Sequence, residues 1–117
     1  MRSVALVLML LISPVAHTNW STSDTARQLV FTGLQVVDWA QTREIARNPH
    51  YYEVNPILGS SPSAVEVNAY FLATTVGHYA VARALPPHHR KVWQYVWIGA
   101  QAATVTHNYQ IGIRIDF

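Results

Sequence analysis

The sequence has no cysteine and little charge. Without cysteine among its 117 residues, the chain has no disulfide, thiolate zinc site or cysteine nucleophile. Asp, Glu, Lys and Arg make up 12% of the residues, against roughly 25% in an average soluble domain. The eight basic residues are scattered along the chain, whereas a nucleic-acid site needs them clustered. These absences leave a single charge-poor domain with no nucleic-acid partner.

The usual motifs of catalysis and metal binding are missing as well. No two histidines have the HxxxH or HExxH spacing of a zinc-binding helix. The serine-rich stretch GSSPS, residues 59–63, does not match the GxSxG of a serine hydrolase, and there is no glycine-rich phosphate loop. We therefore predict no metal and no cofactor. A non-enzymatic role is favoured, and catalysis stays open as the alternative.

The N-terminus, MRSVALVLMLLISPVAHTNW, contains the chain's longest apolar run. Arg2 precedes the apolar residues 4–12, and Ser13-Pro14 follows as a breaker. This order is typical of a secretory signal peptide, and the apolar run is shorter than the roughly 20 residues that span a bilayer. We predict that residues 1–17 are a signal peptide or an uncleaved signal anchor. Residues 18–117 then form a single helical domain.

Helical signals divide that domain into three parts. The predicted helices cover residues 24–47, 64–85 and 88–109. Ser21 or Ser23 can cap the first helix, and SAVE, residues 63–66, is a capping box at the start of the second. Pro86-Pro87 separates the second helix from the third. The predicted fold class is all-α, a three-helix membrane bundle after the N-terminal segment, with a short extended C-terminal tail.

The second and third helices each offer about twenty residues with few charges, enough for one bilayer crossing. The sequence therefore predicts a bundle in the inner membrane of a bacterium, where its helices contact the lipid bilayer. The low mean hydropathy of +0.11 favours the alternative, a soluble periplasmic bundle.

Polar side chains recur on one face of each predicted helix. The stripe on the first helix consists of Gln28, Thr32, Gln35, Asp38 and Thr42. Gln94, Gln101 and Asn108 are spaced by seven on the third helix, and Thr75 and His78 share a face of the second. Polar groups in hydrocarbon need partners, so we expect a polar seam, and expect Asp38 to pair with His78 or His107. The predicted seam comprises Gln35, Asp38, Thr42, Glu53, Asn55, His78, Gln101 and Asn108.

Two further patterns bear on packing. Small residues follow one another at a spacing of four: Ala69, Ala73 and Gly77 on the second helix, and Gly99 and Ala103 on the third. Such faces let two helix backbones approach closely, so we expect these two helices to pack through them. In the loop HYYEVNPILGSSPS, residues 50–63, we expect Glu53 and Asn55 to return towards the helix ends.

The C-terminal stretch NYQIGIRIDF alternates apolar and polar residues. Strict alternation indicates an extended strand. An apolar alternation that ends on a terminal phenylalanine, here Phe117, also resembles the outer-membrane assembly signal of bacterial β-barrels. An outer-membrane location, with this tail docked as a strand, is therefore a further alternative.

Three segments of the chain resemble a set of small uncharacterised membrane proteins of bacteria and tailed phages. They are DWAQTR (residues 38–43), YYEVNPILG (51–59) and HNYQIGI (107–113), which together give the pattern DWxQTR…YYExNPILG…HNxxIGI. The resemblance implies an integral membrane protein with a shared polar centre. It implies no reaction.

These observations predict a small exported envelope membrane protein with a structural or partner-binding role, its bacterial or phage origin left open. Its partner is another envelope protein or a second copy of the chain. The first alternative is an intramembrane enzyme or proton-coupled device built on Asp38, Glu53, His78 and His107. The second is a soluble periplasmic helical protein.

Overall fold

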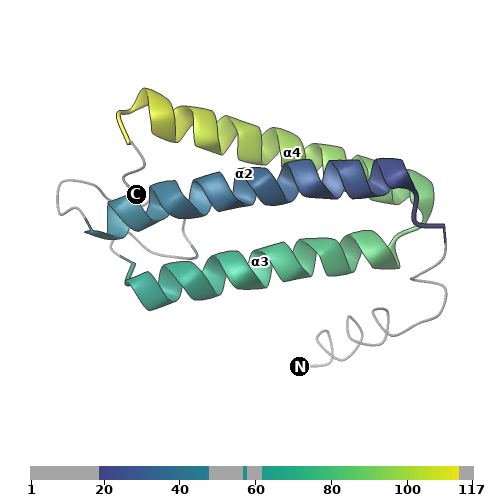
Figure 1. The fold of residues 1–117 in the computed structure, drawn as a ribbon, viewed down its shortest axis with the longest axis horizontal. Helices are drawn as coiled ribbons and strands as arrows, with labels where there is room; N and C mark the ends of the chain where they lie inside the picture. The colour runs from purple at the N-terminus through teal and green to yellow at the C-terminus, as the bar shows by residue number, and fades with distance from the viewer. Residues whose placement is uncertain (1–18, 48–56, 58–61, 114–117) are drawn as a thin grey trace.

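The computed structural model describes residues 19–47, 57 and 62–113, and the regular structure within them is entirely α-helical. The elements are α2 (Thr22–Arg47), α3 (Ala64–Ala84) and α4 (Pro87–Gln110). Each boundary lies within two residues of the predicted one. α2 and α4 run in one direction and α3 in the other (Figure 1). The predicted all-α, three-helix bundle is thereby confirmed.

Local sequence signals set the helix starts. At α3 the Glu66 backbone N–H donates to Ser63 Oγ at 3.1 Å, and the Ser63 N–H donates to Glu66 Oε1 at 3.3 Å. This is the predicted capping box. At α2, Ser21 and Asp24 exchange the same two bonds, at 3.1 and 2.9 Å. Ser21, one of the two expected candidates, is therefore the cap.

The end of α4 corrects the predicted extended tail. The alternating stretch begins inside the helix, which runs to Gln110. The chain then closes in a Schellman motif: Ile113 N–H bonds to Asn108 O at 3.0 Å and Gly112 N–H to Tyr109 O at 3.1 Å. Gly112 has φ +98°, a conformation that only glycine adopts without strain. The strand prediction is wrong for residues 109–113, and residues 114–117 lie outside the described part.

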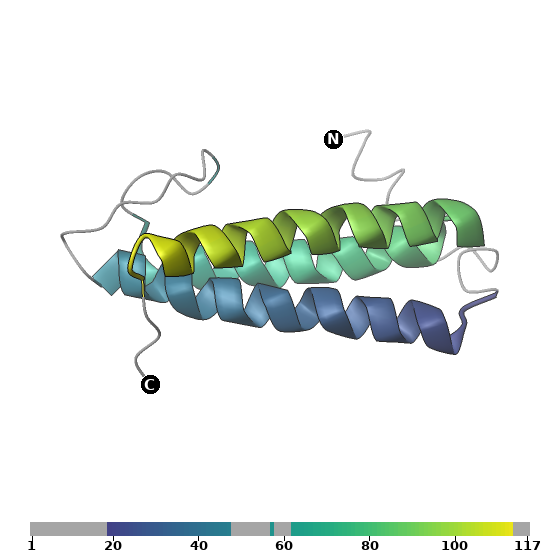
Figure 2. The same ribbon diagram turned by 90° about the horizontal axis from the view of Figure 1, so that it is seen from above.

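α2 packs along both other helices, whereas α3 and α4 contact each other less. Figure 2 shows the three helices running side by side over most of their length. The apolar core is small. Val67 and Phe71 are buried, and Trp39, Ala46 and Tyr70 pack against them.

More polar than apolar side chains are buried in the described part of the chain. The buried polar residues are Asp24, Gln28, Gln35, Asp38, Gln41, Thr42, His78, Arg90, Gln94 and Asn108. Large apolar side chains lie on the outside of all three helices: Leu29, Val30, Val36, Val65, Leu72, Val76, Tyr79, Val92, Tyr95, Val96, Trp97 and Tyr109. The number of buried polar side chains is the unusual feature, since polar residues are mostly exposed in soluble domains.

Within the described residues, we find no helix that is both long and apolar enough to cross a membrane. The expected transmembrane helices are therefore not supported in that part of the chain. The predicted signal segment, residues 1–17, lies outside it.

The small-residue faces do not hold α3 and α4 together. Ala69, Ala73 and Gly77 are exposed, as are Gly99 and Ala103. A Cβ atom added at Gly77 or Gly99 would meet nothing within 4 Å. The expected close packing is wrong, because both helices dock mainly on α2.

Candidate functional site

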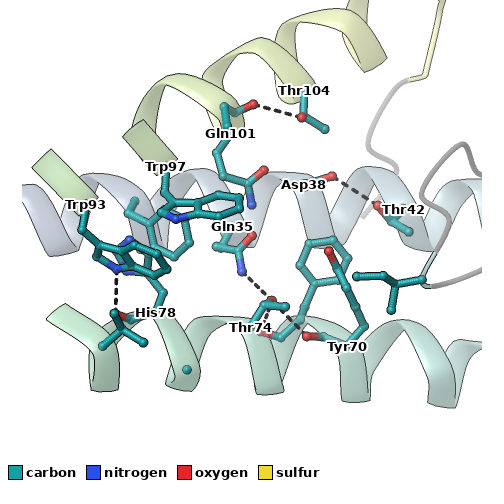
Figure 3. Close-up of a pocket in the computed structure, with 16 residues that line it drawn as sticks. Gln35, Asp38, Thr42, Tyr70, Thr74, His78, Trp93, Trp97, Gln101 and Thr104 are labelled. Carbon is teal, nitrogen blue, oxygen red and sulfur yellow. Dashed lines mark hydrogen bonds between the residues drawn. The ribbon is translucent and has the colours of Figure 1, made fainter. Parts of the chain in front are cut away.

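A cavity of about 620 Å³ lies among the three helices and opens between α3 and α4. Residues of α2 form its floor, and residues of α3 and α4 form its two walls (Figure 3). Ile57, Gly77, Trp97, Ala100 and Thr104 line it and are also exposed, so they mark its mouth. The remaining lining residues are Phe31, Gln35, Asp38, Thr42, Tyr70, Phe71, Thr74, His78, Val81, Trp93 and Gln101. Its volume falls within the roughly 300–1,000 Å³ of small-molecule sites.

Hydrogen bonds position the polar groups of the cavity floor. The Gln35 amide nitrogen donates to Thr74 Oγ1 at 2.9 Å and Thr75 Oγ1 at 3.1 Å, which joins α2 to α3. The Thr42 hydroxyl donates to Asp38 Oδ1 at 3.3 Å, one helical turn away. Gln35, Asp38 and Thr42 thus form a polar row on α2, one turn or less apart, that faces the cavity.

His78 is buried at the edge of this cavity, with 4% of its surface exposed. Its ring stacks on Phe31 at a centroid distance of 3.6 Å and on Trp93 at 5.3 Å. The Trp93 indole N–H also donates to the backbone oxygen of His78 at 3.2 Å. Burial lowers the pKa of His78 to about 4, so the ring is neutral near pH 7.

The two ring nitrogens of His78 differ in their partners. Nδ1 lies 3.0 Å from the Gln28 amide nitrogen. An amide nitrogen can only donate, so Nδ1 accepts and the neutral ring carries its hydrogen on Nε2. Nε2 is buried and has no hydrogen-bond partner among the described residues. His78 therefore brings an unpaired N–H to the cavity wall.

A second polar cluster, centred on Arg90, ties the three helices together at the start of α2. The Arg90 side chain is 1% exposed and pairs with Asp24 Oδ2 at 2.8 Å. It also donates to the backbone oxygens of Ala82 at 2.6 Å and Leu85 at 3.1 Å, at the end of α3. Arg90 itself sits in the first turn of α4. One guanidinium thus connects all three helices.

Asp24 receives further support from its surroundings. Arg27 pairs with its other carboxylate oxygen. The Gln94 amide nitrogen donates to the Asp24 backbone oxygen at 3.0 Å. Burial pushes the pKa of Asp24 up, but hydrogen bonds from Ser21 and Arg90, together with the positive charge of Arg90, outweigh burial. The pKa therefore lies below its usual value, and the carboxylate is charged at neutral pH.

Arg90 was not among the residues predicted to matter for function, although the sequence contains one signal for it. A cation in the first turn of a helix faces the positive end of the helix dipole, which is unfavourable. Arg90 occupies this position directly after Pro86-Pro87. Such a placement indicates a tertiary partner strong enough to outweigh the dipole.

The structure brings part of the predicted polar seam together. Five of its members line the cavity: Gln35, Asp38, Thr42, His78 and Gln101. Asn108 instead meets α2 further along, where its amide nitrogen donates to Gln41 Oε1 at 3.0 Å. Glu53 and Asn55 lie outside the described residues.

The four candidate catalytic residues are not assembled in the described structure. Asp38 and His78 share the cavity, but His78 Nδ1 bonds to Gln28. His107 is exposed on the last turn of α4 and does not line the cavity, and Glu53 is not described. In the described ranges, no three His, Asp or Glu side chains converge as metal ligands.

No model of a known protein family matches the chain, and neither curated proteins nor solved structures include a significant match. The geometry of the cavity and the pattern of buried and exposed side chains therefore provide the evidence for a function.

Proposed function

We propose that the chain is a small exported, non-enzymatic binding protein of the bacterial cell envelope, which holds an amphipathic ligand in the cavity between α3 and α4. The observation that carries this proposal is the cavity itself, which combines a polar floor with aromatic walls and an open mouth. A concave, largely apolar site with a few convergent polar groups is the usual form of a ligand pocket.

The outer surface supports a place in the envelope. Val30 and Val36 on α2 are about half exposed, and Leu72 on α3 is 69% exposed. Apolar side chains exposed on several helices are compatible with contact with lipid or another protein. The signal-like N-terminus and the resemblance to small membrane proteins support the same location, the inner membrane. The periplasm and the outer membrane are the alternatives, and the resemblance leaves a phage origin open.

The rival proton-coupled function has less support. It required Asp38, Glu53, His78 and His107 to act together. His78 is neutral near pH 7 because of its burial, and His107 is exposed outside the cavity. The arrangement of the described residues favours ligand binding over proton transfer.

Photo-crosslinking from inside the cavity tests the binding function. A benzophenone amino acid at Gly77, where an added Cβ atom meets nothing within 4 Å, should form a covalent adduct in living cells. Ala100→Trp should abolish that adduct because position 100 lines the cavity. Gly99→Trp, an equally bulky change at the next, exposed residue, should leave it unchanged. If no adduct forms, or Ala100→Trp and Gly99→Trp behave alike, the cavity is not the binding site.

Cell fractionation tests the location. The tagged protein should sediment with membranes and resist a carbonate wash, and mass spectrometry of the mature N-terminus should show whether residues 1–17 are removed. Recovery in the soluble periplasmic fraction would instead establish a periplasmic location, and recovery in the outer membrane would establish an outer-membrane location.

A further inference from the structure

An unpaired hydrogen-bond donor on the cavity wall indicates the class of the ligand, an inference that rests on the proposed binding function. His78 lines the cavity, and its Nε2 is buried without a hydrogen-bond partner among the described residues. Phe31 and Trp93, the rings that stack on His78, line the cavity as well. A buried donor without a partner is unfavourable, and more so in apolar surroundings. A ligand that brings an acceptor to this N–H removes that penalty.

A chain of amide groups fixes the hydrogen of the neutral His78 ring on Nε2. The Gln94 side chain is oriented from both ends, because Arg27 Nε donates to its oxygen at 2.7 Å and its nitrogen donates to the Asp24 backbone oxygen at 3.0 Å. The same Gln94 nitrogen donates to Gln28 Oε1 at 3.4 Å, so the Gln28 nitrogen is the atom that lies 3.0 Å from His78 Nδ1. An amide nitrogen only donates, so Nδ1 accepts. Side chains outside the cavity lining therefore hold His78 as an Nε2–H donor.

The chemistry of this donor selects among polar groups of a ligand. An ammonium group has no acceptor and cannot pair with an N–H. An anion would find no positive charge here, because burial lowers the pKa of His78 to about 4. A hydroxyl group would need an acceptor for its own hydrogen among the rings of Phe31 and Trp93. A neutral carbonyl oxygen, which only accepts hydrogen bonds, has none of these disadvantages.

We propose that the cavity binds a neutral carbonyl compound with an apolar chain, and that His78 determines this specificity by donating Nε2–H to the carbonyl oxygen. The chain lies between the aromatic side chains of α3 and α4, where Figure 3 shows Tyr70 opposite Trp93 and Trp97. Nε2 is shielded from solvent in this structure. Binding therefore includes a rotamer change of a neighbouring lining side chain, a change that is common when partners bind.

Two probes of matched shape test the hydrogen bond directly. They are 2-octanone and 2-methyl-1-octene, in which a CH₂ group replaces the carbonyl oxygen. NMR of the purified full-length chain at pH 7, with its histidines labelled with ¹⁵N, should first show the ring hydrogen of His78 on Nε2. Addition of 2-octanone should move the Nε2–H proton signal downfield, as a new hydrogen bond requires, and the alkene should not. Ala100→Trp should abolish this shift, whereas Gly99→Trp should not.

A matched pair of histidine variants tests whether His78 sets the preference. The affinities of both probes are measured by the change in tryptophan fluorescence, since Trp93 and Trp97 line the cavity. His78→Phe keeps an aromatic ring without the donor and should lower the affinity for 2-octanone relative to the alkene by about fivefold, as for the loss of one hydrogen bond. His107→Phe makes the same change at an exposed residue outside the cavity and should leave that ratio unchanged. Circular dichroism of both variants checks that they are folded, and the NMR comparison on the unaltered chain does not depend on either variant.

The outcomes separate this inference from the binding function. If the ring hydrogen lies on Nδ1, or if 2-octanone binds without moving the Nε2–H signal, the inferred role of His78 is wrong. If neither probe binds while the Gly77 crosslinker still gives an adduct sensitive to Ala100→Trp, the inferred ligand class is wrong and the binding function stands. If there is neither binding nor an adduct, both are wrong.

Discussion

Replacing Arg90 by methionine should destabilise the protein by about 3 kcal/mol or more, because the guanidinium is buried and connects three helices. The methionine retains an apolar stem of similar length but no donor. The change leaves the backbone oxygens of Ala82 and Leu85 without this donor and removes one of the two cations paired with the buried Asp24. Breaking a buried ion pair from one side costs about 3–5 kcal/mol. We expect a value near the lower limit because Arg27 still contacts Asp24.

The free energy of unfolding can be measured by urea titration followed by tryptophan fluorescence, since Trp93 lies on the same helix as Arg90. A loss of about 3 kcal/mol is a large part of the roughly 5–15 kcal/mol that stabilises a typical domain, so the shift in the urea midpoint should be easy to detect.

Arg83→Met is the matched control for the same substitution. Arg83 lies at the end of α3 and stacks over Trp20 at 4.0 Å, with a hydrogen bond to the exposed Tyr79 hydroxyl at 2.8 Å. Its loss should cost about 1 kcal/mol or less. The double variant Asp24→Asn with Arg90→Met removes the buried charge and should be less destabilised than the sum of the single changes. Equal effects of Arg90→Met and Arg83→Met would refute the reasoning.

Two more predictions concern buried polar side chains. The pKa of His78 is about 4 in the folded chain and 6.5 in the unfolded one, so only the unfolded chain binds this proton between those values. The stability that His78 contributes is complete above pH 6.5 and should fall by about 3 kcal/mol as the pH drops to 4. In chemical denaturation across this range, the free energy of unfolding should depend less on pH in His78→Asn than in the unaltered chain. His107→Asn is the control and should keep the pH dependence of the unaltered chain. Asn108→Leu leaves Gln41 Oε1 without its donor and should cost about 1–3 kcal/mol in thermal unfolding. Adding Gln41→Leu should recover part of that loss, and strict additivity of the two changes would contradict direct coupling.

Local sequence determined the helices. A capping box involves residues three apart, as in Ser63 and Glu66, and a proline pair interrupts a helix wherever it occurs. These signals do not depend on the rest of the chain, so the three helices could be predicted to within two residues. The fixed angle of 100° per residue also puts Gln35, Asp38 and Thr42 on one face of α2, and the structure buries all three.

Only the tertiary structure decided which helices meet, and through which faces. The small residues of α3 and α4 were compatible with close packing, but both helices dock on α2, and the space left between them is the cavity. Arg90 and Asp24 are 66 residues apart in sequence, so no local pattern pairs them. The alternation at residues 109–113 was outweighed by the continuing helix and its glycine cap. The physical reason is the range of the forces: caps and helix periodicity act within a few residues, whereas a buried ion pair or a cavity depends on side chains brought together by the whole fold.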